Sequence, residues 1–492
     1  MWGQASGLHP RQSTRGDRPR ACTRSSPTRG EGAEISPSLI FLLFSLLIAG
    51  APAGITPDRA RDLLTRLLSA EEASRATARL AISRSNDRSF LPALVDALFF
   101  ASPEARGDVV ACLESLSGER LGPDYRYWVE YVGGRGDVRP KSGYLAWKAA
   151  LFSRIDPAFA TFLDPSRPMT IRPEEIVWGG VRKDGIPALV NPATVPASRA
   201  TFLADAETVF GVSIGPESRA YPQRILDWHE MANDVVGGRP LALSYCTLCG
   251  SAIAYGTATS DGTVLTFGSS GLLYRSNKLM YDAGTLSLWS NLTGEPVAGP
   301  LVGRGLRLVA LPLTVTTWKD WKKRHPETTV VSLETGHRRD YTAGAAYGRY
   351  FASPETMFPV WKRNPALPVK SWIYAVRAGG RAKAYPLDIL FRERVVNDRI
   401  LALPVVVVAD PETGAVRAYE RAGRRFAEGP GGTLVEPETG RQWDVAEEGL
   451  RARSKGELLP RVAGHRAYWF GWYGAFPDAE VYEGCPEAGP PF

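Results

Sequence analysis

The stretch "AYPQRILDWHEMANDVVGGRPLALSYCTLCGSAIAY", Ala220 to Tyr255, has a counterpart later in the chain in "AYPLDILFRERVVNDRILALPVVVVADPETGAVRAY", Ala384 to Tyr419. The two stretches align without a gap at an offset of 164 residues, and 11 of the 36 aligned positions are identical. An internal repeat of this length indicates that one structural unit occurs twice. We therefore expect a body made of two tandem copies of one unit, at residues 200–345 and 346–483.

Residues that both copies share are predicted to serve the fold. The Tyr-Pro pairs that begin at Tyr221 and Tyr385 predict the end of a strand leading into a helix, with proline in the first helical turn. The Asn-Asp pairs that begin at Asn233 and Asn397 predict turns in which side chains bond to the backbone.

Three residues of the first copy have no equivalent in the second. They are His229, Cys246 and Cys249, and the matching positions of the second copy hold Glu, Asp and Thr. A second copy that folds without these side chains suggests that they serve chemistry rather than the fold. They are the candidate site.

Our first interpretation of the candidate site is a transition-metal centre. Thiolate and imidazole are metal ligands, and a Cys-x-x-Cys pair can reach one ion from a single turn. Cys246, Cys249 and His229 would supply three ligands, and Met280 is a candidate for the fourth. Thioether and thiolate together favour copper, and zinc is the second choice. With zinc, Glu230 is a candidate base for a metal-bound water.

Two alternatives stay open at this point. Cys246 and Cys249 could act as a thiol–disulfide oxidoreductase pair. They could instead form a local disulfide in a structural or interaction protein, with His229 as a hydrogen-bonded surface residue. The sequence leaves open whether a metal-binding protein of this kind is a metalloenzyme or a metal carrier.

The predicted fold class is α+β and multidomain. Residues 56–165 place apolar side chains at three- and four-residue spacing, as in "DRARDLLTRLLSA" and "ARGDVVACLESLSG", which predicts helical hairpins of the HEAT type. Such a segment is a candidate surface for a protein partner. A Pro-rich connector is expected at 166–199, followed by short strands with turns, such as "TVFGVSI" and "SAIAYG".

The first 53 residues are predicted to be a basic leader and signal peptide. Its apolar core, "LIFLLFSLLIAG" at 39–50, is followed by "APAG" and is shorter than the roughly 20 residues of a membrane-spanning helix. We expect a periplasmic or extracellular protein with no stable membrane span after cleavage, or with an N-terminal anchor if the leader is retained. Residues 484–492 are expected to be a tail.

Composition excludes some functions. The net charge of +7 is spread without a concentrated basic stripe, so no nucleic-acid partner is expected. Five cysteines in 492 residues are too few for a disulfide scaffold.

The remaining histidines of the β-rich body have no nearby candidate ligands in the sequence. We predict that they are surface residues: His325, His337 and His465.

The motifs "YPQRILDWHEMANDVVGGRPLALSYCTLCGSAIAYG", "LTFGSSGLLYRSNKLMYDAGTLSLWSNLTGEPVAGPL" and "AYPLDILFRERVVND" resemble the bacterial family catalogued as domain of unknown function 3179. The resemblance covers about residues 170–483. The helical segment before it resembles an accessory found in some members. The resemblance implies no particular activity, so the function has to be argued from the site.

Overall fold

The computed structural model describes residues 55–454 and 456–484, which belong to one compact unit that begins at Ile55. The predicted leader (1–53) and nearly all of the predicted tail (484–492) lie outside the described residues. Within the described part of the chain, every helix is too short or too polar to cross a membrane.

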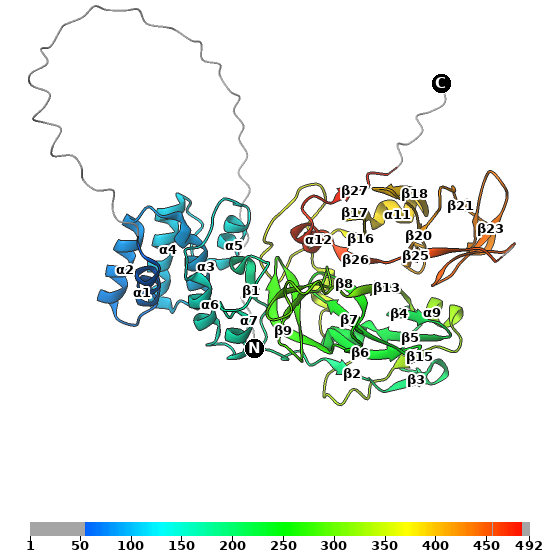
Figure 1. Cartoon of the computed structure of the whole chain (residues 1–492), viewed down its shortest axis with the longest axis horizontal. Coiled ribbons are helices and arrows are strands. Elements are labelled where there is room, and N and C mark those ends of the chain that lie inside the picture. Colours follow the sequence, from blue (N-terminus) through cyan, green and yellow to red (C-terminus); the bar gives the residue numbers. More distant parts are fainter. Residues whose placement is uncertain (1–54, 455, 485–492) are drawn as a thin grey trace, which may run out of the picture. The chain divides into compact units, whose positions relative to one another are not determined.

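The segment that follows Ile55 is helical, as predicted (Figure 1). Its helices are α1 (Pro57–Leu67), α2 (Glu72–Arg84), α3 (Leu91–Phe100), α4 (Pro103–Ser117), α5 (Tyr125–Gly133), α6 (Tyr144–Phe152) and α7 (Ala158–Phe162).

The ends of these helices follow from local chemistry. The hydroxyls of Thr56 and Ser102 accept hydrogen bonds from backbone N–H groups in the first turns of α1 and α4. Gly118 ends α4 in the left-handed conformation, which glycine adopts without a steric penalty. Leu94 and Cys112 are fully buried between the helices. The helical segment is therefore confirmed, while its HEAT-type arrangement stays a prediction.

The first β-rich unit, together with three short strands of the predicted connector (166–199), forms three five-stranded sheets, ordered β1-β9-β10-β11-β12, β13-β8-β7-β6-β2 and β14-β4-β5-β15-β3. Its elements are β1 (Ile176–Trp178), β2 (Leu189–Val190), β3 (Thr194–Pro196), β4 (Thr208–Ile214), β5 (Glu217–Pro222), α8 (Gln223–His229), β6 (Met231–Val236), β7 (Arg239–Cys246), β8 (Ser251–Gly256), β9 (Phe267–Tyr274), β10 (Asn277–Asp282), β11 (Leu288–Ser290), β12 (Pro296–Ala298), β13 (Val309–Leu311), β14 (Thr314–Thr317), α9 (Trp318–Arg324) and β15 (Thr329–Val331).

The second unit contains a four-stranded sheet, β26-β16-β17-β27, and an eight-stranded sheet, β18-β19-β20-β25-β24-β23-β22-β21. Its elements, after the connecting helix α10 (Gly348–Ala352), are β16 (Trp372–Ala378), β17 (Arg381–Pro386), α11 (Leu387–Glu393), β18 (Val395–Ile400), β19 (Leu403–Ala409), β20 (Val416–Glu420), β21 (Ala427–Glu428), β22 (Leu434–Val435), β23 (Gln442–Val445), β24 (Gly449–Ala452), β25 (Leu458–Val462), β26 (Gly464–Tyr468), α12 (Trp469–Ala475) and β27 (Glu480–Val481).

The same order of elements occurs in both units. An antiparallel pair, a short helix and a three-stranded meander form β4-β5-α8-β6-β7-β8 in the first unit and β16-β17-α11-β18-β19-β20 in the second. Each unit ends with a strand, a helix and a strand that pairs in parallel with the second strand of the unit. The α+β class is confirmed. This order agrees with the predicted repeat, and the duplication itself stays a prediction.

The shared dipeptides are placed partly as expected. Each Tyr-Pro pair ends a strand and leads into a helix, with Pro222 and Pro386 at the N-cap. The prediction that the Asn-Asp pairs form turns is wrong, because Asn233 and Asn397 lie inside β6 and β18. Their side chains do form hydrogen bonds with backbone groups, but these groups belong to residues about 30 positions away in the sequence. Such distant partners have no signal in the local sequence.

Candidate functional site

The Cys-x-x-Cys motif lies at the turn between two central strands of the first unit. Cys246 is the last residue of β7, and Cys249 lies on the turn before β8. The N–H of Cys249 donates to the Cys246 carbonyl at 3.2 Å, and Gly250 completes the turn with φ +63°. This tight turn brings the Sγ atoms of Cys246 and Cys249 to 2.9 Å from each other. Both residues are free thiols.

The two thiols are buried and differ in acidity. Cys246 is 2% exposed and Cys249 is 0% exposed. Burial and the nearby Glu230 carboxylate oppose ionisation of Cys246, but its hydrogen bond with the Cys249 thiol and those from the backbone N–H groups of Lys278 and Cys249 outweigh them and lower its pKa. Burial and the neighbouring Cys246 raise the pKa of Cys249 well above its ordinary value. Cys246 is therefore the thiol that ionises first.

A buried ion pair lies beside Cys246. Lys278 donates to the Glu230 carbonyl at 2.8 Å, and its Nζ is 3.5 Å from Glu230 Oε2. Glu230 Oε1 accepts a hydrogen bond from the hydroxyl of Thr247, inside the Cys-x-x-Cys turn, at 2.7 Å. The carboxylate predicted as a catalytic base is thus held by Thr247 and Lys278, and it fixes the turn that carries the cysteines.

His229 lies at the end of α8 and points to other partners. Its Nδ1 is 2.8 Å from the Pro187 carbonyl, and its Nε2 is 2.6 Å from the hydroxyl of Tyr341. A carbonyl only accepts, so Nδ1 carries the proton and the Nε2 lone pair accepts from Tyr341. Burial lowers the pKa of His229 to about 4, which keeps the ring neutral. Both nitrogens of His229 are therefore engaged with Pro187 and Tyr341 rather than with the cysteines.

Met280 lies in the apolar core of the first unit. It is 0% exposed and belongs to a cluster with Met231 and Trp289, whereas the two cysteines belong to a different cluster. Across the described ranges 55–454 and 456–484, no group of three His, Cys, Asp or Glu side chains could hold a metal ion. Of the predicted ligands, the structure therefore brings together Cys246 and Cys249 alone.

Aromatic side chains cover the cysteine pair. We call Tyr347, Tyr350, Phe351, Trp372 and Tyr468 the aromatic cover; all five pack in the same apolar cluster as the cysteines. The Tyr350 hydroxyl donates to the Leu248 carbonyl at 2.6 Å, and the Tyr468 N–H donates to the Cys249 carbonyl at 2.7 Å. The cover therefore bonds directly to the Cys-x-x-Cys turn, from residues of α10 and of the second unit.

A cavity of about 270 Å³ opens next to this turn. Gly250, Tyr245 and Phe351 line it together with Trp372 and Arg466. The guanidinium of Arg466 lies 4.7 Å from the Trp372 ring, and in the part of the chain that the structure describes its buried Nε has no hydrogen-bond partner. The cavity reaches the Cys-x-x-Cys turn at Gly250, the residue that follows Cys249.

Sequence reasoning did not identify Lys278 or the aromatic cover. Lys278 had a weak local signal, because it stands next to the apolar run "LMY" in the strand "NKLMYD", every residue of which is buried. The aromatic cover had none, since its members lie about 100 to 220 positions after the cysteines and only tertiary packing brings them there.

The fold and the site define an α+β protein with a helical segment, two β-rich units and a buried pair of free thiols in the first unit. The chain belongs to the family described as "Protein of unknown function (DUF3179)", whose model matches residues 183–479. This match confirms the resemblance seen in the sequence. No curated protein and no solved structure matches the chain.

Proposed function

We propose that Cys246 and Cys249 form a reversible dithiol–disulfide centre that exchanges electrons with the disulfide of a partner molecule. The observation that carries the proposal is the 2.9 Å separation of the two Sγ atoms on one tight turn. A disulfide bond of about 2.05 Å can form from there by small side-chain rotations. An exported protein, as the leader predicts, would work in a compartment where disulfides persist.

The difference in acidity gives the two thiols an order. Cys246, with its lowered pKa, would attack one sulfur of the partner disulfide, forming a mixed disulfide and releasing the first partner thiol. Cys249 would then attack Cys246 Sγ, forming the Cys246–Cys249 bond and releasing the second partner thiol. Two electrons pass to the partner, and the two protons of the cysteines leave on its thiols. The reverse reaction would oxidise a partner dithiol.

Access to the pair requires the aromatic cover to move, because both cysteines are almost fully buried. The cavity beside Gly250 marks the side of approach. The second unit, with Asp410 where the first has Cys246, would serve as scaffold and supply Tyr468 and Trp372 to the cover.

Trapping the mixed disulfide tests this proposal. Cys249→Ser leaves Cys246 without its resolving thiol, so incubation with oxidised glutathione should accumulate a glutathione adduct at Cys246, detected by peptide mass spectrometry. Cys246→Ser should accumulate far less at Cys249, whose pKa is raised. Cys112→Ser is the control, because Cys112 is buried in the helical segment with its pKa raised to about 11. Absence of the adduct in Cys249→Ser, under conditions where the denatured protein reacts, would contradict the proposal.

A second candidate is binding of Cu(I) by the two thiolates. It is favoured by two sulfurs that converge in a buried apolar cluster, since soft thiolates suit Cu(I). This site would not use His229 or Met280. Zinc is less favoured, because a structural zinc site needs four ligands. An anaerobic Cu(I) titration distinguishes the two candidates. Binding of one ion per chain that is lost in both Cys246→Ser and Cys249→Ser but retained in Cys112→Ser would favour a Cu(I) carrier over a redox centre.

A further inference from the structure

A cavity of about 410 Å³, a size that suits a small-molecule ligand, lies between the two β-rich units. From the first unit it is lined by residues of β8, of the loop at Leu292 and of β13. From the second unit it is lined by the hairpin that joins β16 to β17 and by β26. The cysteine pair does not line it, so the cavity is separate from the site above.

Most of the polar side chains that line this cavity are basic. They include Arg307, Arg377, Arg381 and His465, and no Asp or Glu is among the lining residues. Arg307 is paired with Glu295 outside the cavity. Within the described residues, Arg377 and Arg381 make no ion pair; Arg377 donates only to the Leu292 carbonyl, at 3.0 Å. Two guanidinium groups without a carboxylate leave the cavity with uncompensated positive charge.

His465 adds an unused polar group to the wall. The sequence predicted a surface residue, and this is wrong, because His465 is only 8% exposed. Its Nε2 is buried and has no hydrogen-bond partner among the described residues. The ring packs against Trp472, with ring centroids 5.3 Å apart. A buried polar atom without a partner is costly unless a ligand or water bonds to it.

The rest of the wall is apolar. The first unit supplies the buried side chains of Ile253, Tyr255, Leu292 and Leu308, and the second unit supplies alanines. A wall of this kind suits a ligand with an apolar body and one polar end. The arginines and His465 suit a charged end that accepts several hydrogen bonds, as a carboxylate or phosphate does.

We propose that the cavity between the two units is a binding site for a small organic anion, with a carboxylate or phosphate head held by Arg377, Arg381 and His465. The apolar body would lie against Tyr255 and Leu308. A ligand held from both sides would also fix one unit against the other.

Isothermal titration calorimetry on the full chain tests this proposal, with benzoate and phenyl phosphate as anionic probes and benzyl alcohol as the neutral probe. We expect one saturable site per chain for at least one anion, and binding of benzyl alcohol at least about tenfold weaker. The anion that binds more tightly identifies the head group.

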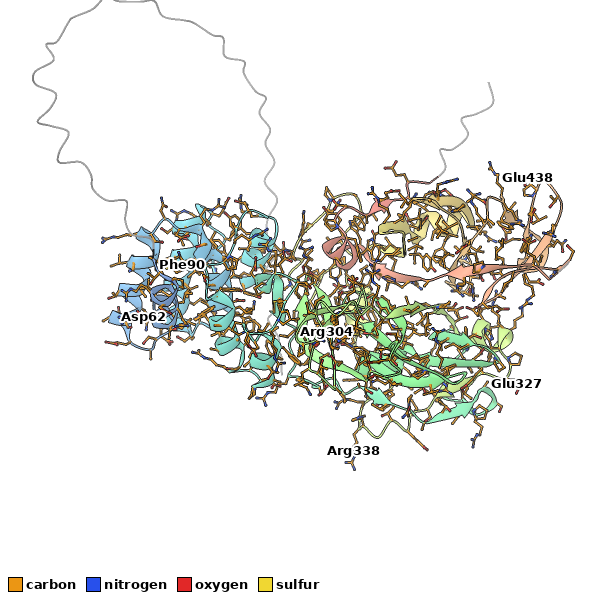
Figure 2. The ribbon with its side chains drawn as sticks, viewed as in Figure 1. Asp62, Phe90, Arg304, Glu327, Arg338 and Glu438 are labelled. Atoms are coloured by element: carbon orange, nitrogen blue, oxygen red, sulfur yellow. The ribbon has the colours of Figure 1, made fainter. Side chains whose placement is uncertain are left out.

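Three variants and one control make the test specific. Arg377→Met and Arg381→Gln should each weaken binding of the tighter anion by at least about tenfold, because each removes a charge-assisted hydrogen bond. His465→Phe keeps the ring packing and should also weaken binding. Arg338→Gln, at an exposed side chain labelled in Figure 2, removes the same charge from a residue that does not line the cavity and should leave binding unchanged.

Several results would overturn the proposal. One is the absence of saturable binding for both anions. Another is binding of benzyl alcohol that is as tight as that of the anions. A third is equal affinity of Arg381→Gln and the wild type for the tighter anion. Arg381 is exposed on the hairpin, so this variant remains informative if Arg377→Met does not fold. None of these measurements depends on the thiols, so the outcome is independent of the proposed redox function.

Discussion

Asn397 and Phe426 are joined by two hydrogen bonds: the amide Nδ2 of Asn397 donates to the Phe426 carbonyl at 2.7 Å, and the Phe426 N–H donates to Asn397 Oδ1 at 2.8 Å. In the first unit, Asn233 and Phe267 make the same two bonds, at 2.9 and 2.8 Å. In each unit one asparagine thus ties the meander to the strand or loop that follows it. Residues common to both units therefore hold the fold together.

We expect Asn233→Ala and Asn397→Ala to lower the free energy of unfolding by about 1–3 kcal/mol each, because each leaves backbone groups without partners. Asn233 should show the larger loss, since it is buried while Asn397 is only half-buried. Chemical denaturation measures the loss. Glu438→Ala, at an exposed position labelled in Figure 2, is the control and should change stability by less than about 0.5 kcal/mol. Equal stability of all three variants would contradict this role.

His229→Ala should also destabilise the fold. The sequence comparison suggested that the imidazole is dispensable for folding, because the second unit has Glu393 at the matching place. In the structure both residues accept a hydrogen bond from a tyrosine hydroxyl. Nε2 of His229 accepts from Tyr341, and Oε2 of Glu393 accepts from Tyr482 at 2.7 Å. We expect a loss of about 1–3 kcal/mol. Unchanged melting together with loss of bound metal would contradict this and restore His229 as a ligand.

Two buried histidines should make the protein sensitive to mild acid. Burial lowers the pKa of His229 to about 4 and that of His465 to about 3, against an ordinary value near 6.5. Below pH 6.5 the unfolded chain binds protons that the folded chain does not, so the free energy of unfolding decreases as the pH is lowered. Each of the two histidines contributes a decrease of about 1.4 kcal/mol per pH unit.

The acid sensitivity is best measured as a difference, because Asp227 acts with the opposite sign. Burial raises its pKa to about 7, so this carboxyl stabilises the fold as pH falls from 7 toward 4. Urea unfolding at pH 6.5, 5.5 and 4.5 should give His465→Phe a stability that falls less steeply than that of wild type, by about 1.4 kcal/mol per unit. Parallel curves would show that His465 is charged in the folded protein.

Gly250 is required beside the cysteines for two reasons. Its φ of +63° is strained for other residues, and a Cβ there would come within 2.4 Å of Trp372. Gly215 has a similar φ of +58° and nothing within 4 Å of a Cβ. We expect Gly215→Ala to cost about 1 kcal/mol and Gly250→Ala to cost more, with a change in tryptophan fluorescence. Equal costs for the two variants would show that the aromatic cover is not packed on the turn.

Helices and strands could be predicted from the sequence, but the tertiary contacts of individual side chains could not. The strands Thr208–Ile214 and Ser251–Gly256 and the helix Gln223–His229 lie where periodicity and the Tyr-Pro signal predicted them. The Cys-x-x-Cys turn was also predictable, because local spacing alone brings Cys246 and Cys249 together. The contacts of His229 could not be predicted from the local sequence, because its partners Pro187 and Tyr341 lie 42 and 112 residues away.

The redox state of Cys246 and Cys249 tests the account most directly. The full chain would be equilibrated in buffers of graded thiol–disulfide potential, quenched, alkylated after denaturation and mapped by peptide mass spectrometry. We predict one reversible two-electron transition at Cys246 and Cys249, at a potential above about −300 mV, where structural disulfides are normally already oxidised. Cys112 should stay a thiol throughout. Two thiols that remain alkylatable under oxidising conditions, or a bond formed only at potentials typical of structural disulfides, would contradict the proposed function.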